Sequence, residues 1–259
     1  GFDTAWIAQH HFHEREGGLP SPLVFLAHIA AYTTRIRLGT AIITLPLENP
    51  LRVAEDTAVL DLLSDGRLEV GFGSGGTPTS FLPFGLTINE RAATFADHLH
   101  LINSAWRGDS LAHPDNHLYP PAPGLTERVW IATFSVEGAV RAARQGHGLM
   151  LSRTQPRPAD NLALPLDAIQ NPIIDAYLDA LPSGIAPRIL ASRTAFVADS
   201  DAYALKVAEP GLTRQAQQHQ AAGHALTGDA VTDYIRQFDA HIGAPQTVLA
   251  SLAQDSVLA

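Results

Sequence analysis

The sequence predicts an α/β fold of alternating parallel strands and helices, the kind that closes into a (β/α)8 TIM-type barrel. From Gly1 to Ser152, short apolar runs alternate with amphipathic helical segments, the pattern of βα units stacked around a parallel sheet. The length of 259 residues suits one barrel domain over residues 1–259. The pattern holds about six strands, so a closed eight-stranded barrel would need about two more.

The first part of the chain is expected to form three strands separated by two helices. The strand segments are "TAWIA", "RIRLGTAIITL" and "RLEVGFG". Ser21-Pro22 offers an N-cap and a first-turn proline for the first helix. Asn49-Pro50 does the same for the second helix, and Asp65-Gly66 is expected to end it.

Further along, the pattern continues and then weakens. A helix is expected over residues 89–107, followed by the proline-rich loop "HPDNHLYPPAPG", the strand "RVWIATF", the helix "SVEGAVRAARQG" and the strand "GLMLS". Residues 153–168 are then expected to form a loop, and residues 188–198 one strand. The remainder is mostly polar helix and ends in a helix at 247–259.

Composition narrows the possible functions. A formal net charge of −9 argues against a nucleic-acid or membrane partner, because both would require clustered Lys and Arg. The absence of cysteine fits a cytoplasmic location and excludes thiolate chemistry. Lys206 is the only lysine and lies in a polar, helix-like stretch, so Schiff-base chemistry is not expected. No apolar run is long enough to span a bilayer.

The segment "QHHFH" places three histidines near the start of the chain. If it continued a strand, His11 and His13 would share one face and could hold a metal together. Such a site needs further ligands at later strand ends, and these offer acids only at Glu48 and Asp199, so no metal is expected. A polar loop and a general base facing a pocket both remain open.

Three longer segments carry a resemblance to a known family. They are "PSPLVFLAHIA", "IRLGTAIITLPLENPLRVAEDTAVLDLLSDGRLEVGFGSGG" and "WIATFSVEGAVRAARQGHGLMLSR". With the histidine segment, they make the chain resemble the bacterial luciferase-like flavin monooxygenases, almost without interruption from Gly1 to Arg153. From Arg188 on the match is weaker, although "HIGAPQTVLASLAQD" is similar to the helix before the family's last strand.

The resemblance implies a (β/α)8 barrel that holds FMN or a deazaflavin over the carboxyl ends of its strands. The family's first strand and its last strand would be missing here. It also implies a two-component monooxygenase, in which a separate flavin reductase supplies reduced FMN. Reaction with O2 would give a C4a-peroxide that oxygenates a small organic substrate, and homodimers are usual. Two alternatives stay open: a non-catalytic flavin-binding protein and a deazaflavin-dependent hydride-transfer oxidoreductase.

The resemblance also assigns residues to the chemistry. His10 would be the catalytic base, and His11 would support it. The family often has Glu at the position of Gln9, so this chain loses a charge beside His10. Under the flavin ring, the family carries a non-proline cis peptide that would fall at Ala41-Ile42, directly after Thr40. Without the resemblance, the sequence favours an ordinary buried strand there.

The end of the third strand and a later arginine are also cofactor candidates. The glycines of "GFGSGG", which include Gly73, permit close backbone approach to a ligand. Many relatives carry an arginine at the position of Ser74, where it helps to neutralise the phosphate. Arg153, next to Ser152, could take over this charge, could face an acidic substrate, or could have only a surface role.

The segment "ATFSVEG" predicts a phosphate site. A strand followed at once by Ser135 and a helix leaves backbone N–H groups at the positive end of a helix dipole. By the resemblance, the site would also include Thr133, Val136, Glu137 and Gly138. The alternative is that Ser135 only caps the helix.

Overall fold

The computed structural model describes two compact units. It covers residues 1–14, 17–158, 160–221 and 223–258. The first unit consists of residues 1–132 and 145–148, and the second of residues 133–144 and 149–259. Each unit is described by itself.

The first unit contains a parallel sheet. Its strands are β1 (Thr4–Ile7), β2 (Arg37–Thr40), β3 (Ile43–Thr44), β4 (Leu68–Gly73) and β5 (Val129–Ala132). β1 pairs with β2, β2 with β4, and β4 with both β3 and β5, and all of these pairs are parallel. β4 is buried along its whole length, as expected for a strand covered on both faces.

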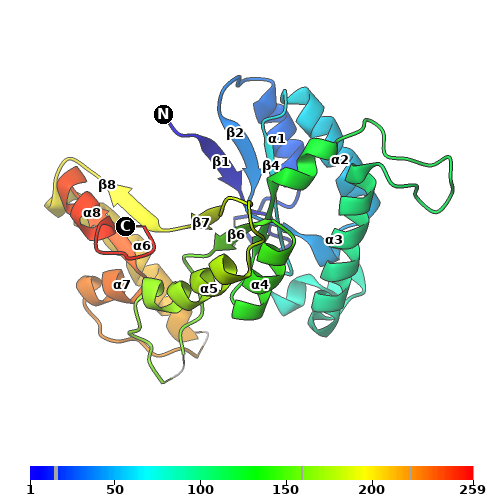
Figure 1. Ribbon diagram of the computed structural model, residues 1–259. Coiled ribbons are helices and arrows are strands. Elements are labelled where there is room, and N and C mark those ends of the chain that lie inside the picture. The colour runs from blue at the N-terminus through cyan, green and yellow to red at the C-terminus, as the bar shows by residue number, and fades with distance from the viewer. Residues whose placement is uncertain (15–16, 159, 222, 259) are drawn as a thin grey trace. The chain divides into compact units, whose positions relative to one another are not determined.

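The helices of the first unit begin largely where the sequence predicts. They are α1 (Pro22–Ala30), α2 (Pro50–Leu63) and α3 (Arg91–Arg107). α1 packs against β2 and α2, and α2 packs against β4 and α3 (Figure 1). Asn49 accepts hydrogen bonds from the backbone N–H groups of Leu51 (3.0 Å) and Arg52 (3.2 Å), which confirms the expected N-cap. Ser21 makes no such bond, so its side chain does not cap α1.

Aromatic packing joins α3 to the sheet. Phe72 on β4 stacks on Trp106 of α3 with ring centroids 6.2 Å apart, and both side chains are buried. Short 3-10 helices connect the larger elements: η2 (Leu45–Leu47), η3 (Pro78–Ser80), η4 (Leu82–Phe84), η5 (Ile88–Glu90) and η6 (Pro123–Arg128). The expected proline-rich loop therefore ends in a 3-10 helix.

The second unit holds two parallel strand pairs and five helices among its described residues. The elements are α4 (Val136–Arg144), β6 (Gly148–Leu151, whose first residue belongs to the first unit), α5 (Leu166–Ala180), β7 (Ile189–Ala191), β8 (Thr194–Val197), α6 (Asp201–Ala221), α7 (Val231–Gln237), β9 (Ala240–Gly243) and α8 (Pro245–Leu252). β6 pairs with β7, and β8 pairs with β9. α4 packs against α5, and α6, α7 and α8 pack against β9.

Two of the expected strands are each divided in two. The segment 35–45 forms β2 and β3, which are separated at Ala41-Ile42. The segment 188–198 forms β7 and β8, which have different partners. Between them, the backbone N–H of Ser192 donates to the carbonyl of Leu151 (3.0 Å), while the buried guanidinium of Arg193 turns to the carboxylate of Asp255.

Two elements were not predicted from the sequence. α5 follows the expected loop, and Pro172 lies inside it, a residue that disfavours a helix interior. β9 is a short strand within a segment expected to be helical. Closure of the strands into a barrel, and the single domain over residues 1–259, stay predictions. None of the helices in the described part of the chain is long and apolar enough to cross a membrane.

Candidate functional site

The histidine segment lies in a loop that follows β1. β1 ends at Ile7, so the strand alternation considered for His11 and His13 does not apply, and the segment forms the loop that was the alternative. Phe12 has a positive φ of 65°, and the backbone N–H of His13 donates to the carbonyl of His11 (2.8 Å), which gives a tight turn. The Nε2 of His13 lies 3.0 Å from the hydroxyl of Thr79, within hydrogen-bond distance.

His11 has a pKa that is lowered from its ordinary value. Its ring packs edge-on against Phe84 (centroids 5.1 Å) and near Phe12 (5.7 Å). Burial lowers its pKa, the nearby Glu48 raises it, and His10 lowers it further. The buried Nε2 of His11 has no hydrogen-bond partner within the described residues. A neutral imidazole in this place can accept a hydrogen bond or a proton.

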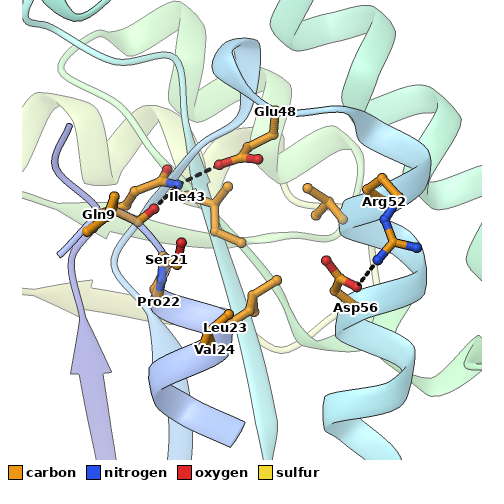
Figure 2. A pocket seen from close by; sticks show the side chains of 11 residues that line it. Gln9, Ser21, Pro22, Leu23, Val24, Ile43, Glu48, Arg52 and Asp56 are labelled. Carbon is orange, nitrogen blue, oxygen red and sulfur yellow. Dashed lines mark hydrogen bonds and ion pairs between the residues drawn. The ribbon is translucent and has the colours of Figure 1, made fainter. Parts of the chain in front are cut away.

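Gln9, next to these histidines, is the centre of a buried hydrogen-bond network. Its Oε1 accepts from the backbone N–H of Thr44 (2.7 Å), and its Nε2 donates to the carbonyl of Pro20 (2.9 Å) and to Glu48 (2.6 Å). Figure 2 shows its side chain pointing toward Glu48. Gln9 therefore links the histidine loop to the segment after β3.

A small pocket lies beside this network, with a volume of about 100 Å³. Gln9, Glu48 and the start of α1 line it, together with Arg52 and Asp56, which form an ion pair of 2.8 Å (Figure 2). Ligand sites for drug-sized molecules usually measure about 300–1,000 Å³, so this pocket is too small for a flavin.

The predicted flavin-ring residues of the first unit lie where β2 and β4 end and where β3 begins. The peptide bond between Ala41 and Ile42 is cis, as expected. Gly73 faces Ile42, and a Cβ on Gly73 would come within 2.8 Å of the Ile42 side chain. Thr40 is fully buried, and its hydroxyl bonds to both the N–H (2.9 Å) and the carbonyl of Gly71 (3.0 Å), so it braces the sheet. Ser74 follows Gly73 and is half-buried.

In the second unit, the predicted phosphate residues form a hydrogen-bonded turn. The hydroxyl of Ser135 accepts from the backbone N–H of Gly138 (3.1 Å), so the capping role is confirmed. The backbone N–H of Ser135 donates to the hydroxyl of Thr133 (3.1 Å). A Cβ on Gly138 would overlap Thr133, so only glycine fits. Val136 and Glu137, at the first turn of α4, are exposed.

Ser152 and Arg153 lie in the turn after β6. The hydroxyl of Ser152 accepts from the backbone N–H of Thr154 (3.1 Å). The backbone N–H of Arg153 donates to the hydroxyl of Ser192 (2.8 Å), and its exposed guanidinium reaches the hydroxyl of Thr194 (3.4 Å). The side chain is thus open to a ligand anion.

Two buried glutamines in the second unit were missed by the sequence reasoning. The Nε2 of Gln155 donates to the carbonyl of Phe134 (3.2 Å), and the Nε2 of Gln170 donates to the carbonyl of Ser152 (3.0 Å). Each holds the turn after one strand. A glutamine that is buried against a turn far away in the chain belongs to no local sequence pattern. No signal in the sequence could therefore have identified Gln155 and Gln170.

The titratable side chains of the described residues do not gather into a metal site. No group of three or more His, Asp or Glu suited to a metal ion occurs in the residues the structure covers. The predicted site residues therefore form two sets. One set lies in the first unit, around the histidine loop and Ala41-Ile42, and the other lies in the second unit, around the start of α4.

Comparison with known proteins gives the family. A model described as luciferase-like monooxygenase matches residues 1–257. The uncharacterized protein y4vJ of Sinorhizobium fredii (strain NBRC 101917 / NGR234) is 37% identical over 160 residues, which cover 59% of this chain and 45% of that protein. The match thus spans less than half the length of this relative.

Solved structures share the fold. Monooxygenase RslO1 from Streptomyces bottropensis has a TM-score of 0.73 at 28% identity, over 98% of this chain and 77% of that one. The oxygenating constituent of 3,6-diketocamphane monooxygenase from Pseudomonas putida, solved in complex with FMN, has a TM-score of 0.72 at 18% identity, over 98% of this chain and 78% of that one. The second likeness shows the fold alone. With a family match along nearly its whole length, the chain belongs to the luciferase-like monooxygenases.

Proposed function

We propose that this chain is an FMN-dependent monooxygenase that uses reduced flavin and O2 to oxygenate a small organic substrate. Membership of the luciferase-like monooxygenase family supports this proposal. The observation that carries it is the turn at the start of α4, where Thr133, Ser135 and Gly138 fix one another by hydrogen bonds and close contact. This turn presents the positive end of a nine-residue helix, which suits a phosphate.

The second unit would bind the phosphate of FMN. The backbone N–H groups of Val136 and Glu137, which are exposed residues, and the hydroxyl of Ser135 would donate to it. Thr133 and Gly138 would keep the turn in shape. Arg153, beside Ser152, would supply the cation that relatives place at the position of Ser74. Arginine suits this role because its planar fork matches phosphate oxygens.

The first unit would hold the flavin ring and the proton chemistry. The backbone at Ala41-Ile42 would support the ring, with Gly73 and Ser74 beside it and Thr40 bracing the strand below. Reduced FMN supplies the electrons that activate O2. His10 would accept the substrate proton, and the neutral His11, held against Phe84, would support it.

Flavin titration and His10→Ala test the proposal. We expect FMN to bind, and we expect His10→Ala to keep its FMN affinity while product formation falls by about 10²–10⁴-fold, the usual contribution of a general base. Binding is measured by flavin fluorescence. Product is measured by mass spectrometry with labelled O2 and a panel of small aldehydes and ketones.

A control variant checks that the effect is specific, and two other results would favour the alternative functions. His113→Ala, an exposed histidine of the proline-rich loop, should behave as wild type. Hydrogen peroxide as the sole product would favour a non-catalytic flavin-binding protein, and tighter binding of a deazaflavin would favour hydride transfer. The same assays, with a separate flavin reductase, would test the two-component arrangement. Homodimer formation and a cytoplasmic location are part of this proposal.

A further inference from the structure

The peptide unit between Phe134 and Ser135 is held from both sides by side chains. Its carbonyl accepts from the Nε2 of Gln155 (3.2 Å), and its N–H donates to the hydroxyl of Thr133 (3.1 Å). A peptide plane with both polar groups bonded cannot rotate without breaking two hydrogen bonds. Gln155 therefore fixes the orientation of this peptide, and with it the position of Ser135, whose hydroxyl caps α4.

Gln155 is well placed to hold this peptide rigidly. Its side chain is only 3% exposed, so water competes poorly for the Phe134 carbonyl. The Nε2 bond fixes the amide, which leaves the buried Oε1 without a hydrogen-bond partner in the described part of the chain. A buried polar group of this kind costs stability, which points to a role other than packing.

We propose that Gln155 is a positioning residue for the phosphate end of the flavin, acting through the Phe134–Ser135 peptide. This rests on the proposed function. If the peptide rotated, the hydroxyl of Ser135 and the first N–H groups of α4 would no longer point at one place. The protein would then lose affinity for the phosphate of FMN, while its contacts to the flavin ring would stay unchanged.

A comparison of FMN with riboflavin tests this directly, because riboflavin has the same ring and ribityl chain but no phosphate. The wild-type protein should bind FMN more tightly than riboflavin. Gln155→Met, which keeps the length of the side chain but removes the amide donor, should reduce this preference by about tenfold and leave riboflavin affinity nearly unchanged. Both dissociation constants are measured by fluorescence titration of the oxidised flavins.

Gln237→Met is the matched control. Gln237 is also a glutamine of the second unit, is 4% exposed, and donates to a backbone carbonyl, that of Ala225 (3.0 Å). Its loss should lower thermal stability without changing the ratio of the two affinities. Should Gln155→Met not fold, Gln155→Asn withdraws the donor by one methylene and keeps the site polar, with the same expected change in the ratio.

The possible outcomes separate the two proposals. An unchanged preference for FMN in the folded Gln155 variants, or an equal loss for both flavins, would overturn the positioning role and leave the proposed function standing. Failure of the wild-type protein to bind either flavin would overturn the proposed function itself, and the role of Gln155 with it.

Discussion

Gln9 offers both a donor and an acceptor, and its buried neighbours need both. The N–H of Thr44 requires an acceptor, while the carbonyl of Pro20 and the carboxylate of Glu48 require a donor. A carboxylate at this position could satisfy only the first of the three. If the family's residue here is Glu, as the resemblance implies, the change to Gln reaches beyond His10, because it permits the hydrogen bond to Glu48.

This network gives a charge-swap prediction. Gln9→Glu should destabilise the protein at neutral pH by about 1–3 kcal/mol, because two carboxylates then meet and the Pro20 carbonyl loses its donor. Adding Glu48→Gln to the same chain should restore part of this loss, since the new amide at position 48 can donate to the carboxylate introduced at position 9. Urea unfolding of the two single variants and the double variant measures the coupling. Strictly additive effects would show that the pair does not interact.

Residues of the candidate site could be predicted from the sequence where their hydrogen-bond partners are close to them in the chain. Ser135 and Gly138 could be chosen because a strand, a hydroxyl and a glycine stand together in the chain. Gln155 and Gln170 could not, because their partners lie 21 and 18 residues away and become neighbours only in the fold. The loop that carries the histidines was one of the alternatives that the sequence left open, and the end of β1 at Ile7 decides for it.

At the scale of elements, β9 and α8 are joined through one buried histidine. The Nδ1 of His241 on β9 lies 2.8 Å from the hydroxyl of Ser251 on α8, and its buried Nε2 has no partner in the described residues. Burial lowers the pKa of His241, Asp255 raises it, and Arg193 lowers it further. Arg193 and Asp255 themselves form a buried ion pair, so a second positive charge is poorly accommodated.

The lowered pKa predicts an acid-sensitive element. The unfolded chain binds a proton at this histidine near its ordinary pKa, while the folded chain does so only at lower pH. The stability linked to a neutral His241 is therefore present above about pH 6.5 and is lost as the pH falls below it. Hydrogen exchange at pH 7.5 and 5.5 should show reduced protection of β9 and α8 at the lower pH.

His241→Gln checks the cause, because glutamine keeps a polar side chain but cannot gain the charge. It should weaken the acid response of β9, whereas His113→Gln, in an exposed loop, should leave it unchanged. Burial also lowers the pKa of His11 and His219, so part of the global acid response should remain. An undiminished response of β9 in His241→Gln would assign the effect to other groups.

The elements themselves were partly predictable, for physical reasons. α2 was read correctly because its cap, its apolar face and its Asp65-Gly66 stop are all local, and both stop residues have positive φ. The division of β7 from β8 depends on Arg193 reaching Asp255, 62 residues away. α5 was missed because Pro172 disfavours a helix locally, while packing against α4 stabilises one.

At the scale of the whole molecule, the net charge bears on how FMN would approach the proposed site. The chain carries 26 acidic and 17 basic residues, while FMN carries a phosphate of the same sign as the excess. Long-range repulsion should slow the approach of FMN, although the local field at the start of α4 favours it once it is close. Salt screens the long-range part first, because the Debye length is about 10 Å at 0.1 M.

The association rate of FMN should therefore rise with ionic strength. Stopped-flow fluorescence from low salt to about 0.3 M would measure it, over a range in which the Debye length falls below 10 Å. Riboflavin, which is neutral, gives the control, and its rate should stay flat. Arg153→Ala should slow FMN binding at every salt concentration if this guanidinium guides the phosphate. A rate that falls with salt in the wild-type protein would mean that the field near the site is positive enough to overcome the net charge, and Arg153→Ala would then remove that dependence.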